Sequence, residues 1–168
     1  LIPNKEFRIY YSNDLIGTQI GGALKNIYAI AAGVAEGLNL GENAKSALIS
    51  RSFAEMTRYA KKFKADKNTL FGLSGLGDLI LTCSSKNSRN TQFGIKLASS
   101  KYDNFLDLLK SQEVTEGYYT VKAVYNISQK KNIDMPIMES VYNILYKQHD
   151  LKEELSNLLS RPITEEKI

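Results

Sequence analysis

The feature that most constrains the fold is a long helical stripe of apolar residues near the start of the chain. Between residues 15 and 38, apolar side chains recur every three or four positions. That spacing places them on one face of an α-helix, which must be buried against other elements. Similar patterns predict further helices over residues 43–63, 91–98, 103–111, 117–131, 136–148 and 151–160. The expected fold is therefore an all-α, multi-helix domain.

A short segment at the N-terminus departs from this helical pattern. Residues 7–11 are β-branched or aromatic and lie between turn-forming residues, which predicts one strand. One strand cannot form a sheet alone, so we expect residues 1–13 to be the remnant of an upstream domain. The chain begins at Leu1 and shows no signal-peptide pattern, which indicates a piece of a longer protein. Residues 14–168 are expected to form the helical domain.

Composition excludes several classes of protein. No segment approaches the roughly 20 apolar residues of a membrane span, and the net charge of +4 is scattered rather than clustered. We therefore expect neither a membrane span nor a nucleic-acid partner. The single cysteine, Cys83, excludes an internal disulfide and indicates a reducing compartment. Neither Cys83 nor the single histidine, His149, has metal-ligand spacing, so we expect no metal site.

Lys25 is unusual for a residue on the polar side of the first helix. Its helical neighbours are small residues, two of them the mid-helix glycines Gly21 and Gly22. Such glycines cost about 0.5–1 kcal/mol each, which indicates that something approaches the backbone closely there. One interpretation is tight packing of a second helix, with the lysine reaching past it to solvent. The other is a partly desolvated amine that transfers a proton.

A glycine-rich segment over residues 71–78 ends in Asp78. Its glycine spacing is not that of a dinucleotide-binding loop. It is either a flexible turn capped by Asp78 or a backbone that lets a substrate approach, with Asp78 as an oriented carboxylate. Ser88, Arg89 and Asn90 then open a helix, where Ser88 is either a plain cap or part of an anion-binding cradle.

Taken together, these segments resemble the NAD(P)-dependent glycerol-3-phosphate dehydrogenases, most closely the bacterial form. The resemblance covers nearly the whole chain, in order. It is carried by residues 21–37, 71–83, 88–90, 113–117, 135–137 and 158–162. The family pairs an N-terminal Rossmann domain with an all-α substrate domain of the type found at the C-terminus of 6-phosphogluconate dehydrogenase. The resemblance implies that this chain is the second domain, preceded by a strand stub of the first.

The resemblance also implies an activity and a set of site residues. The family interconverts sn-glycerol 3-phosphate and dihydroxyacetone phosphate with NAD or NADP, in the cytoplasm, for phospholipid synthesis. Lys25 matches the proton-transfer group, and Asp78 matches the carboxylate that orients it. The other matched positions are Asn26, Thr82, Ser88, Arg89 and Asn90 for substrate, and Arg89, Val114 and Glu116 for the cofactor.

Because the Rossmann half is absent from this sequence, we expect the 168 residues alone to be inactive. The expected partners are the phosphorylated substrates and the N-terminal domain, with a homodimer as an open possibility. Two alternatives remain. One is a helical interaction domain without catalysis. The other is the α-domain of a related hydroxy-acid dehydrogenase, which would act on carboxylates instead of a triose phosphate.

Overall fold

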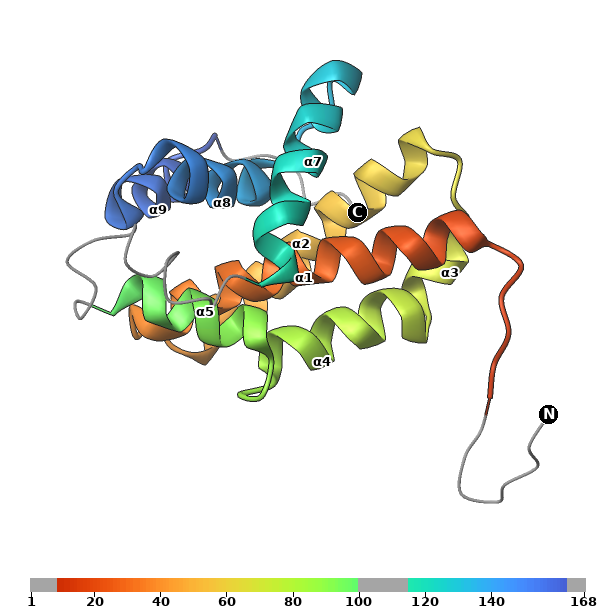
Figure 1. The fold of residues 1–168 in the computed structure, drawn as a ribbon, viewed down its shortest axis with the longest axis horizontal. Helices are drawn as coiled ribbons and strands as arrows, with labels where there is room; N and C mark the ends of the chain where they lie inside the picture. The colour runs from red at the N-terminus through yellow and green to blue at the C-terminus, as the bar shows by residue number, and fades with distance from the viewer. Residues whose placement is uncertain (1–8, 100–114, 163–168) are drawn as a thin grey trace.

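The computed structural model describes residues 9–99 and 115–162, and the regular structure within these ranges is helical (Figure 1). This confirms the all-α prediction. The predicted helix over 103–111 lies outside the described residues. The elements are α1 (Leu15–Gly37), α2 (Glu42–Lys62), α3 (Lys67–Phe71), the π-helical turn η1 (Leu73–Gly77), α4 (Asp78–Ser84), α5 (Arg89–Ala98), α7 (Glu116–Lys131), α8 (Pro136–Lys147) and α9 (Leu151–Leu159).

Helix α1 is the centre of the fold, and it contacts α2, α3, η1, α4, α5, α7 and α8. Figure 1 shows it crossing the middle of the molecule, with α4 and α5 along one side. Asp14 caps its start as the sequence predicts, because its Oδ1 accepts a hydrogen bond from the Gly17 amide at 2.9 Å. Elements that are far apart in the sequence are therefore positioned relative to one another through α1.

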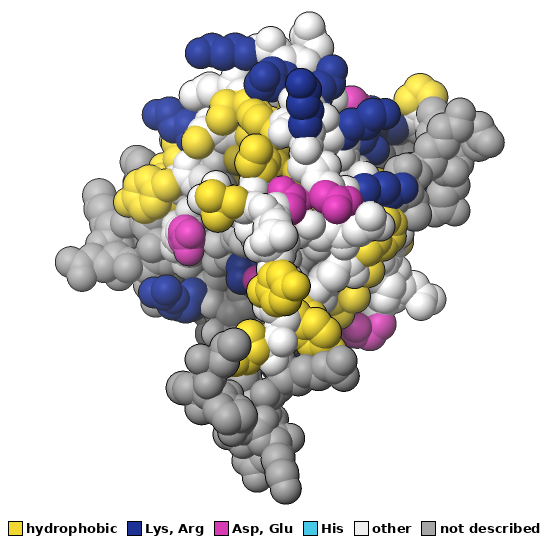
Figure 2. Space-filling model, turned by 90° about the vertical axis from the view of Figure 1, so that its right-hand side faces the viewer, with side chains coloured by type: hydrophobic (Ala, Val, Ile, Leu, Met, Phe, Trp, Pro, Cys, Tyr) yellow, Lys and Arg dark blue, Asp and Glu magenta, His cyan; other side chains and the backbone are white. Residues whose placement is uncertain are grey.

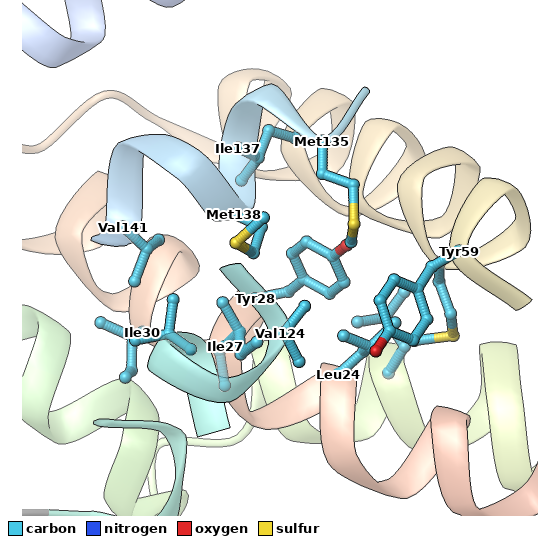
Figure 3. Close-up of a cluster of buried hydrophobic side chains, with 14 of the residues drawn as sticks. Leu24, Ile27, Tyr28, Ile30, Tyr59, Val124, Met135, Ile137, Met138 and Val141 are labelled. Carbon is cyan, nitrogen blue, oxygen red and sulfur yellow. The ribbon is translucent and has the colours of Figure 1, made fainter. Parts of the chain in front are cut away.

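The hydrophobic core lies where the apolar stripe of α1 meets α2, α7 and α8 (Figure 3). Leu24, Ile27 and Tyr28 of α1 are almost completely buried there, together with Met138 of α8 and Val124 of α7. Cys83 is also fully buried and unpaired, so it packs as a small hydrophobic residue. The stripe that predicted α1 is thus the one that forms the core.

Glycines allow α1 and α5 to cross in backbone contact. A β-carbon at Gly33 of α1 would overlap the Thr91 carbonyl oxygen, and one at Gly94 of α5 would overlap the Ile30 carbonyl oxygen. The two glycines let the backbones of α1 and α5 touch where any side chain would separate them. Helix α5 is therefore fixed against α1 at backbone distance.

A buried carboxylate joins α2 to α8. Glu55 accepts hydrogen bonds from the amides of Ile137 at 2.6 Å and Met138 at 3.1 Å, and from the Tyr28 hydroxyl at 3.3 Å. Those amides belong to the first turn of α8, which has no intrahelical acceptors for them. Burial raises the pKa of Glu55 from its usual 4.5 to about 7, although these hydrogen bonds oppose the rise.

The structure differs from the sequence-based expectations in three places. Residues 9–11, the described part of the expected strand, do not form a strand, and residues 7–8 lie outside the described range. A strand needs a hydrogen-bonded neighbour, whereas this segment runs away from the helices (Figure 1). Residues 71–78 do not form a flexible turn, because η1 leads directly into α4. Helices α3 and α4, on either side of η1, were not predicted.

A cavity of about 700 Å³ lies between α1, α2, α8 and α9. Its lining is mostly aliphatic, and it includes none of the predicted site residues that the structure describes. Within residues 9–99 and 115–162, no helix is both long and apolar enough to cross a membrane.

Candidate functional site

Lys25 and Asp78 form the ion pair at the centre of the candidate site. The Lys25 Nζ atom lies 2.5 Å from Asp78 Oδ2, and the two side chains are 24% and 31% exposed. A pair this accessible contributes only about 0.2–1 kcal/mol to stability. The amine is therefore neither a plain surface lysine nor a buried structural ion. It is held by a carboxylate while remaining open to a small molecule.

Two adjacent glycines of α1 serve different purposes beside Lys25. A β-carbon at Gly21 would overlap the backbone carbonyl oxygen of Ser74, so η1 rests directly on α1 at this point. A β-carbon at Gly22 would meet nothing within 4 Å. The predicted close approach to the backbone is therefore confirmed at Gly21, where the approaching group is the protein itself. Gly22 leaves open space about one helical turn before Lys25.

Thr82 supports the carboxylate from one turn further along α4. Its hydroxyl lies 2.6 Å from the Asp78 carbonyl oxygen and 3.3 Å from Asp78 Oδ1. A hydroxyl has one hydrogen, so Thr82 donates chiefly to the nearer carbonyl oxygen, while Asp78 Oδ2 pairs with Lys25. Asp78 is the C-cap residue of η1, and its backbone amide donates to the carbonyl oxygens of Leu73 and Gly75. Its carboxylate contacts Lys25 and Thr82 instead.

Ser88, Arg89 and Asn90 lie where the sequence predicts, at the start of α5. The Ser88 hydroxyl accepts a hydrogen bond from the Thr91 amide at 3.3 Å, so Ser88 is the N-cap. The Arg89 side chain is exposed, whereas Asn90 is buried. The three residues therefore differ in environment: a cap, a solvent-facing cation and a buried amide.

The buried amides of Asn26 and Asn90 connect three helices behind the ion pair. Asn90 Nδ2 donates to Asn26 Oδ1 at 3.1 Å, and Asn90 Oδ1 accepts from the Gly117 amide at 3.0 Å. Gly117 has no room for a side chain, because a β-carbon there would lie 2.7 Å from the Asn26 carbonyl oxygen. The structure brings Asn26, Asn90 and the start of α7 together beside Lys25.

Glu116 is exposed in the first turn of α7, and Val114 lies outside the described residues. The hydrogen bond between the Gly117 amide and Asn90 brings the start of α7 against the start of α5. Glu116 and Arg89 are the first residues of these two helices. Thr115 holds the N-cap position of α7, but its buried hydroxyl makes no capping hydrogen bond.

Two residues at this site, Thr91 and Gly117, were not predicted from the sequence. Thr91 is fully buried, and its hydroxyl donates to the Thr82 carbonyl oxygen at 2.9 Å. Gly117 closes the asparagine network. A threonine in the first turn of a helix and a glycine after a cap carry no distinguishing local signal. Their roles depend on partners 9 and 27 residues away.

The segment that carries Asp78 also exposes apolar side chains. Leu73 of η1 and Leu81 of α4 are 69% and 67% exposed. Leu15, Ile16, Phe71 and Ile80 are exposed as well. Figure 2, which views the side of the molecule where α1 begins and α3 lies, shows hydrophobic side chains interspersed with charged ones.

Comparison with known families decides where the chain belongs. Residues 14–156 match the family model described as NAD-dependent glycerol-3-phosphate dehydrogenase C-terminus. The chain belongs to this glycerol-3-phosphate dehydrogenase family. The glycerol-3-phosphate dehydrogenase (NAD(P)+) of Colwellia psychrerythraea is 46% identical over 157 residues, which cover 94% of this chain and 47% of the relative. The chain thus spans about half the length of the curated relatives it matches.

Solved glycerol-3-phosphate dehydrogenases have the same fold in the corresponding region. The enzyme from Coxiella burnetii superposes with a TM-score of 0.87 at 39% identity, covering 95% of this chain and 49% of that one. The enzyme from Saccharomyces cerevisiae superposes with a TM-score of 0.75 at 27% identity, covering 92% and 51%. The all-α fold is therefore that of the C-terminal part of this dehydrogenase family.

Proposed function

We propose that this chain is the substrate-binding and catalytic domain, residues 14–168, of an NAD(P)-dependent glycerol-3-phosphate dehydrogenase. The whole protein would interconvert sn-glycerol 3-phosphate and dihydroxyacetone phosphate and supply glycerol phosphate for phospholipid synthesis. The observation that carries the proposal is the accessible Lys25–Asp78 ion pair beside the open space at Gly22. Membership of the dehydrogenase family gives that pair a reaction to perform.

Lys25 is the proton-transfer group in this proposal. In the direction of ketone reduction, its ammonium donates a hydrogen bond and then a proton to the oxygen on C2 of the substrate. A positive group at that oxygen stabilises the negative charge that develops there in the transition state. In the direction of alcohol oxidation, the neutral amine takes the same proton back. Asp78 holds the amine in position, and the Thr82 hydroxyl lies 3.3 Å from the second carboxylate oxygen.

The start of α5 binds the phosphate group of the substrate. The exposed Arg89 guanidinium supplies paired N–H donors, and the positive end of the helix dipole favours an anion. Ser88 orders this turn through its cap. Asn26 and Asn90 line the same site, and each uses one of its two amide hydrogens in a contact within the protein. The second hydrogen of each is assigned to the substrate.

The cofactor is bound mainly by the other half of the protein. The described residues contain no βαβ unit. They are therefore proposed to contact only one edge of the bound NAD(P). Arg89 and Glu116, at the two meeting helix starts, suit a charged and hydroxylated ligand at that edge, and Val114 is proposed to join them. When bound, the nicotinamide supplies or accepts the hydride at C2. The chain's own residues place C2 and its oxygen against Lys25.

The exposed apolar residues of η1, α4 and the start of α1 are proposed to face the N-terminal Rossmann domain. Leu73 and Leu81 flank Asp78 along the chain, so a domain docked on them would close over the ion pair. Closure of this kind excludes water and strengthens the electrostatic effect of Lys25. Without that domain, the isolated chain is proposed to be inactive.

We further propose that the whole enzyme works in the cytoplasm and pairs as a homodimer. The free thiol of Cys83 suits a reducing compartment. Tyr119 of α7 and Leu159 of α9 are 68% and 78% exposed, which offers apolar contacts to a second copy. Light scattering on the full-length protein tests the dimer.

A substrate panel tests the activity. The full-length protein is mixed with NADH or NADPH and with dihydroxyacetone phosphate, unphosphorylated dihydroxyacetone or a 2-oxo acid. Oxidation of the cofactor only with the phosphorylated ketone is the expected result, and the ratio of the two cofactors gives the preference. Oxidation with the 2-oxo acid instead would identify a hydroxy-acid dehydrogenase. No oxidation by the folded protein would favour an interaction domain.

A further inference from the structure

Helix α4 is short, yet it carries the carboxylate that must meet Lys25 on α1. It has seven residues, and Asp78 is the first of them. A helix this short is not held in place by its own hydrogen bonds, so its position depends on tertiary contacts. Leu79 and Cys83 bury one face of it in the core, and each of its ends makes a further contact that fixes how it lies on α1. At its start, η1 rests on Gly21 of α1 through the Ser74 carbonyl.

The other end of α4 is held by Thr91. Thr82 lies in the last turn of α4, which ends at Ser84. Carbonyl groups in the last turn of a helix have no intrahelical donors. The Thr91 hydroxyl donates a 2.9 Å hydrogen bond to the Thr82 carbonyl oxygen, one turn after Asp78. Thr91 is itself fully buried and belongs to α5.

Helix α5 is packed against α1, and this packing fixes where the Thr91 hydroxyl lies. The carbonyl oxygen of Thr91 lies against Gly33 of α1, at the close crossing of the two helices. The same residue thus contacts α1 through its backbone and α4 through its side chain. The start of α4 is therefore fixed against α1 through η1 at Gly21. The end of α4 is fixed against α1 through the contact between Thr91 and Thr82.

We propose that Thr91 is a positioning residue for the Lys25–Asp78 pair. Its hydroxyl anchors the C-terminal end of α4 and thereby keeps Asp78 within hydrogen-bonding reach of Lys25. The catalytic consequence rests on the proposed function, whereas the geometric one does not. Removing the hydroxyl leaves the part-buried Thr82 carbonyl without this donor, so α4 shifts and the ion pair loosens.

The test compares Thr91→Val, which keeps the shape and removes the hydroxyl, with Thr91→Ser, which keeps the hydroxyl, in the full-length protein. Thr57→Val is the matched control, because the Thr57 hydroxyl makes a 2.9 Å bond to the Phe53 carbonyl within α2. Thr91→Ala removes the hydroxyl without placing a methyl group against the Thr82 carbonyl, and it replaces Thr91→Val if the latter does not fold.

The first readout is the rate at which a trace of acetic anhydride labels the Lys25 amine, followed by peptide mass spectrometry. Lys45, which pairs with Glu36 at 2.8 Å, is the reference amine in the same molecule. An ammonium held by a carboxylate is protected from acylation, so Thr91→Val is expected to label Lys25 about two- to fivefold faster. Thr91→Ser and Thr57→Val are expected to label it at the wild-type rate.

The second readout is steady-state reduction of dihydroxyacetone phosphate, where Thr91→Val is expected to lower kcat more than it changes KM. Unchanged Lys25 labelling in folded Thr91→Val or Thr91→Ala would overturn the positioning role, even if the wild type is active. Faster labelling combined with no turnover by the wild type would support the positioning role and refute the proposed function. The two ideas therefore fail separately.

Discussion

Lys25 and Asp78 are 53 residues apart in the sequence, and their Nζ and Oδ2 atoms lie 2.5 Å apart in the structure. Each comes from a helix whose placement depends on glycine: α1 carries Lys25 next to Gly21 and Gly22, and α4 follows the glycine-rich turn η1. The pair is too exposed to contribute much stability. The fold thus brings an amine and a carboxylate together where a small molecule can reach both.

The neighbouring glycines Gly21 and Gly22 are expected to respond oppositely to alanine. Gly21→Ala places a methyl group on the Ser74 carbonyl, and such overpacking costs on the order of 1–3 kcal/mol. Gly22→Ala enters open space and should stabilise α1 by about 0.5–1 kcal/mol through helix propensity. Urea unfolding measures both free energies, and equal effects at the two positions would contradict the packing described here.

Glu55 makes stability depend on pH in an unusual direction. Burial raises its pKa from 4.5 to about 7 in the folded chain, so the folded state holds the proton more tightly than the unfolded state. The contribution of Glu55 to the free energy of unfolding is therefore fully present below pH 4.5 and is lost as the pH rises through 7. The loss is on the order of 3 kcal/mol.

Glu55→Gln tests this sign, because glutamine does not titrate. At pH 5 the variant is expected to have a lower free energy of unfolding than the wild type. At pH 8 this difference is expected to be much smaller, and urea unfolding at each pH measures it. Glu42→Gln, at an exposed position in the first turn of α2, is the control. A wild-type advantage over Glu55→Gln that stays constant between pH 5 and pH 8 would refute the raised pKa.

Arg89 is expected to govern affinity for the phosphate group. Replacing its charge by an amide in Arg89→Gln removes charge-assisted hydrogen bonds to the substrate. KM for dihydroxyacetone phosphate should rise about tenfold or more in the full-length enzyme. Arg161→Gln is the matched control, since Arg161 forms an exposed ion pair with Asp134 at 3.0 Å. A similar KM in both variants would remove Arg89 from the phosphate site.

Periodicity in the sequence was sufficient to predict the longer helices. The stripes of α1, α2, α7 and α8 gave their type and their ends to within one or two residues, because each buries a continuous apolar face. The same reasoning missed η1, since glycines have no side chains to show a period. Gly75 packs on the backbone of Leu70, which is a tertiary contact that no local pattern records.

The candidate site was predictable only in part. Lys25 stood out as a single amine among small residues on the side of the helix away from the apolar stripe, and Ser88 was recognisable as a cap. That Asp78 would meet Lys25 followed from the family resemblance, not from spacing. Glu55 was missed because its acceptor role depends on amides 82 and 83 residues away, and a lone glutamate within an apolar stripe gives no indication of such partners.

The most direct test of the account is the rate at which the full-length protein oxidises NADH or NADPH with dihydroxyacetone phosphate, compared between Lys25→Met and Lys45→Met. Lys45 also forms an ion pair with a carboxylate, Glu36, but away from the proposed site, so its variant controls for the loss of a paired lysine. Lys25→Met should reduce kcat about 10²- to 10⁴-fold, the usual contribution of a proton-transfer group, while Lys45→Met keeps wild-type activity. Equal activity of the two variants would contradict the assignment of Lys25 as the proton-transfer group.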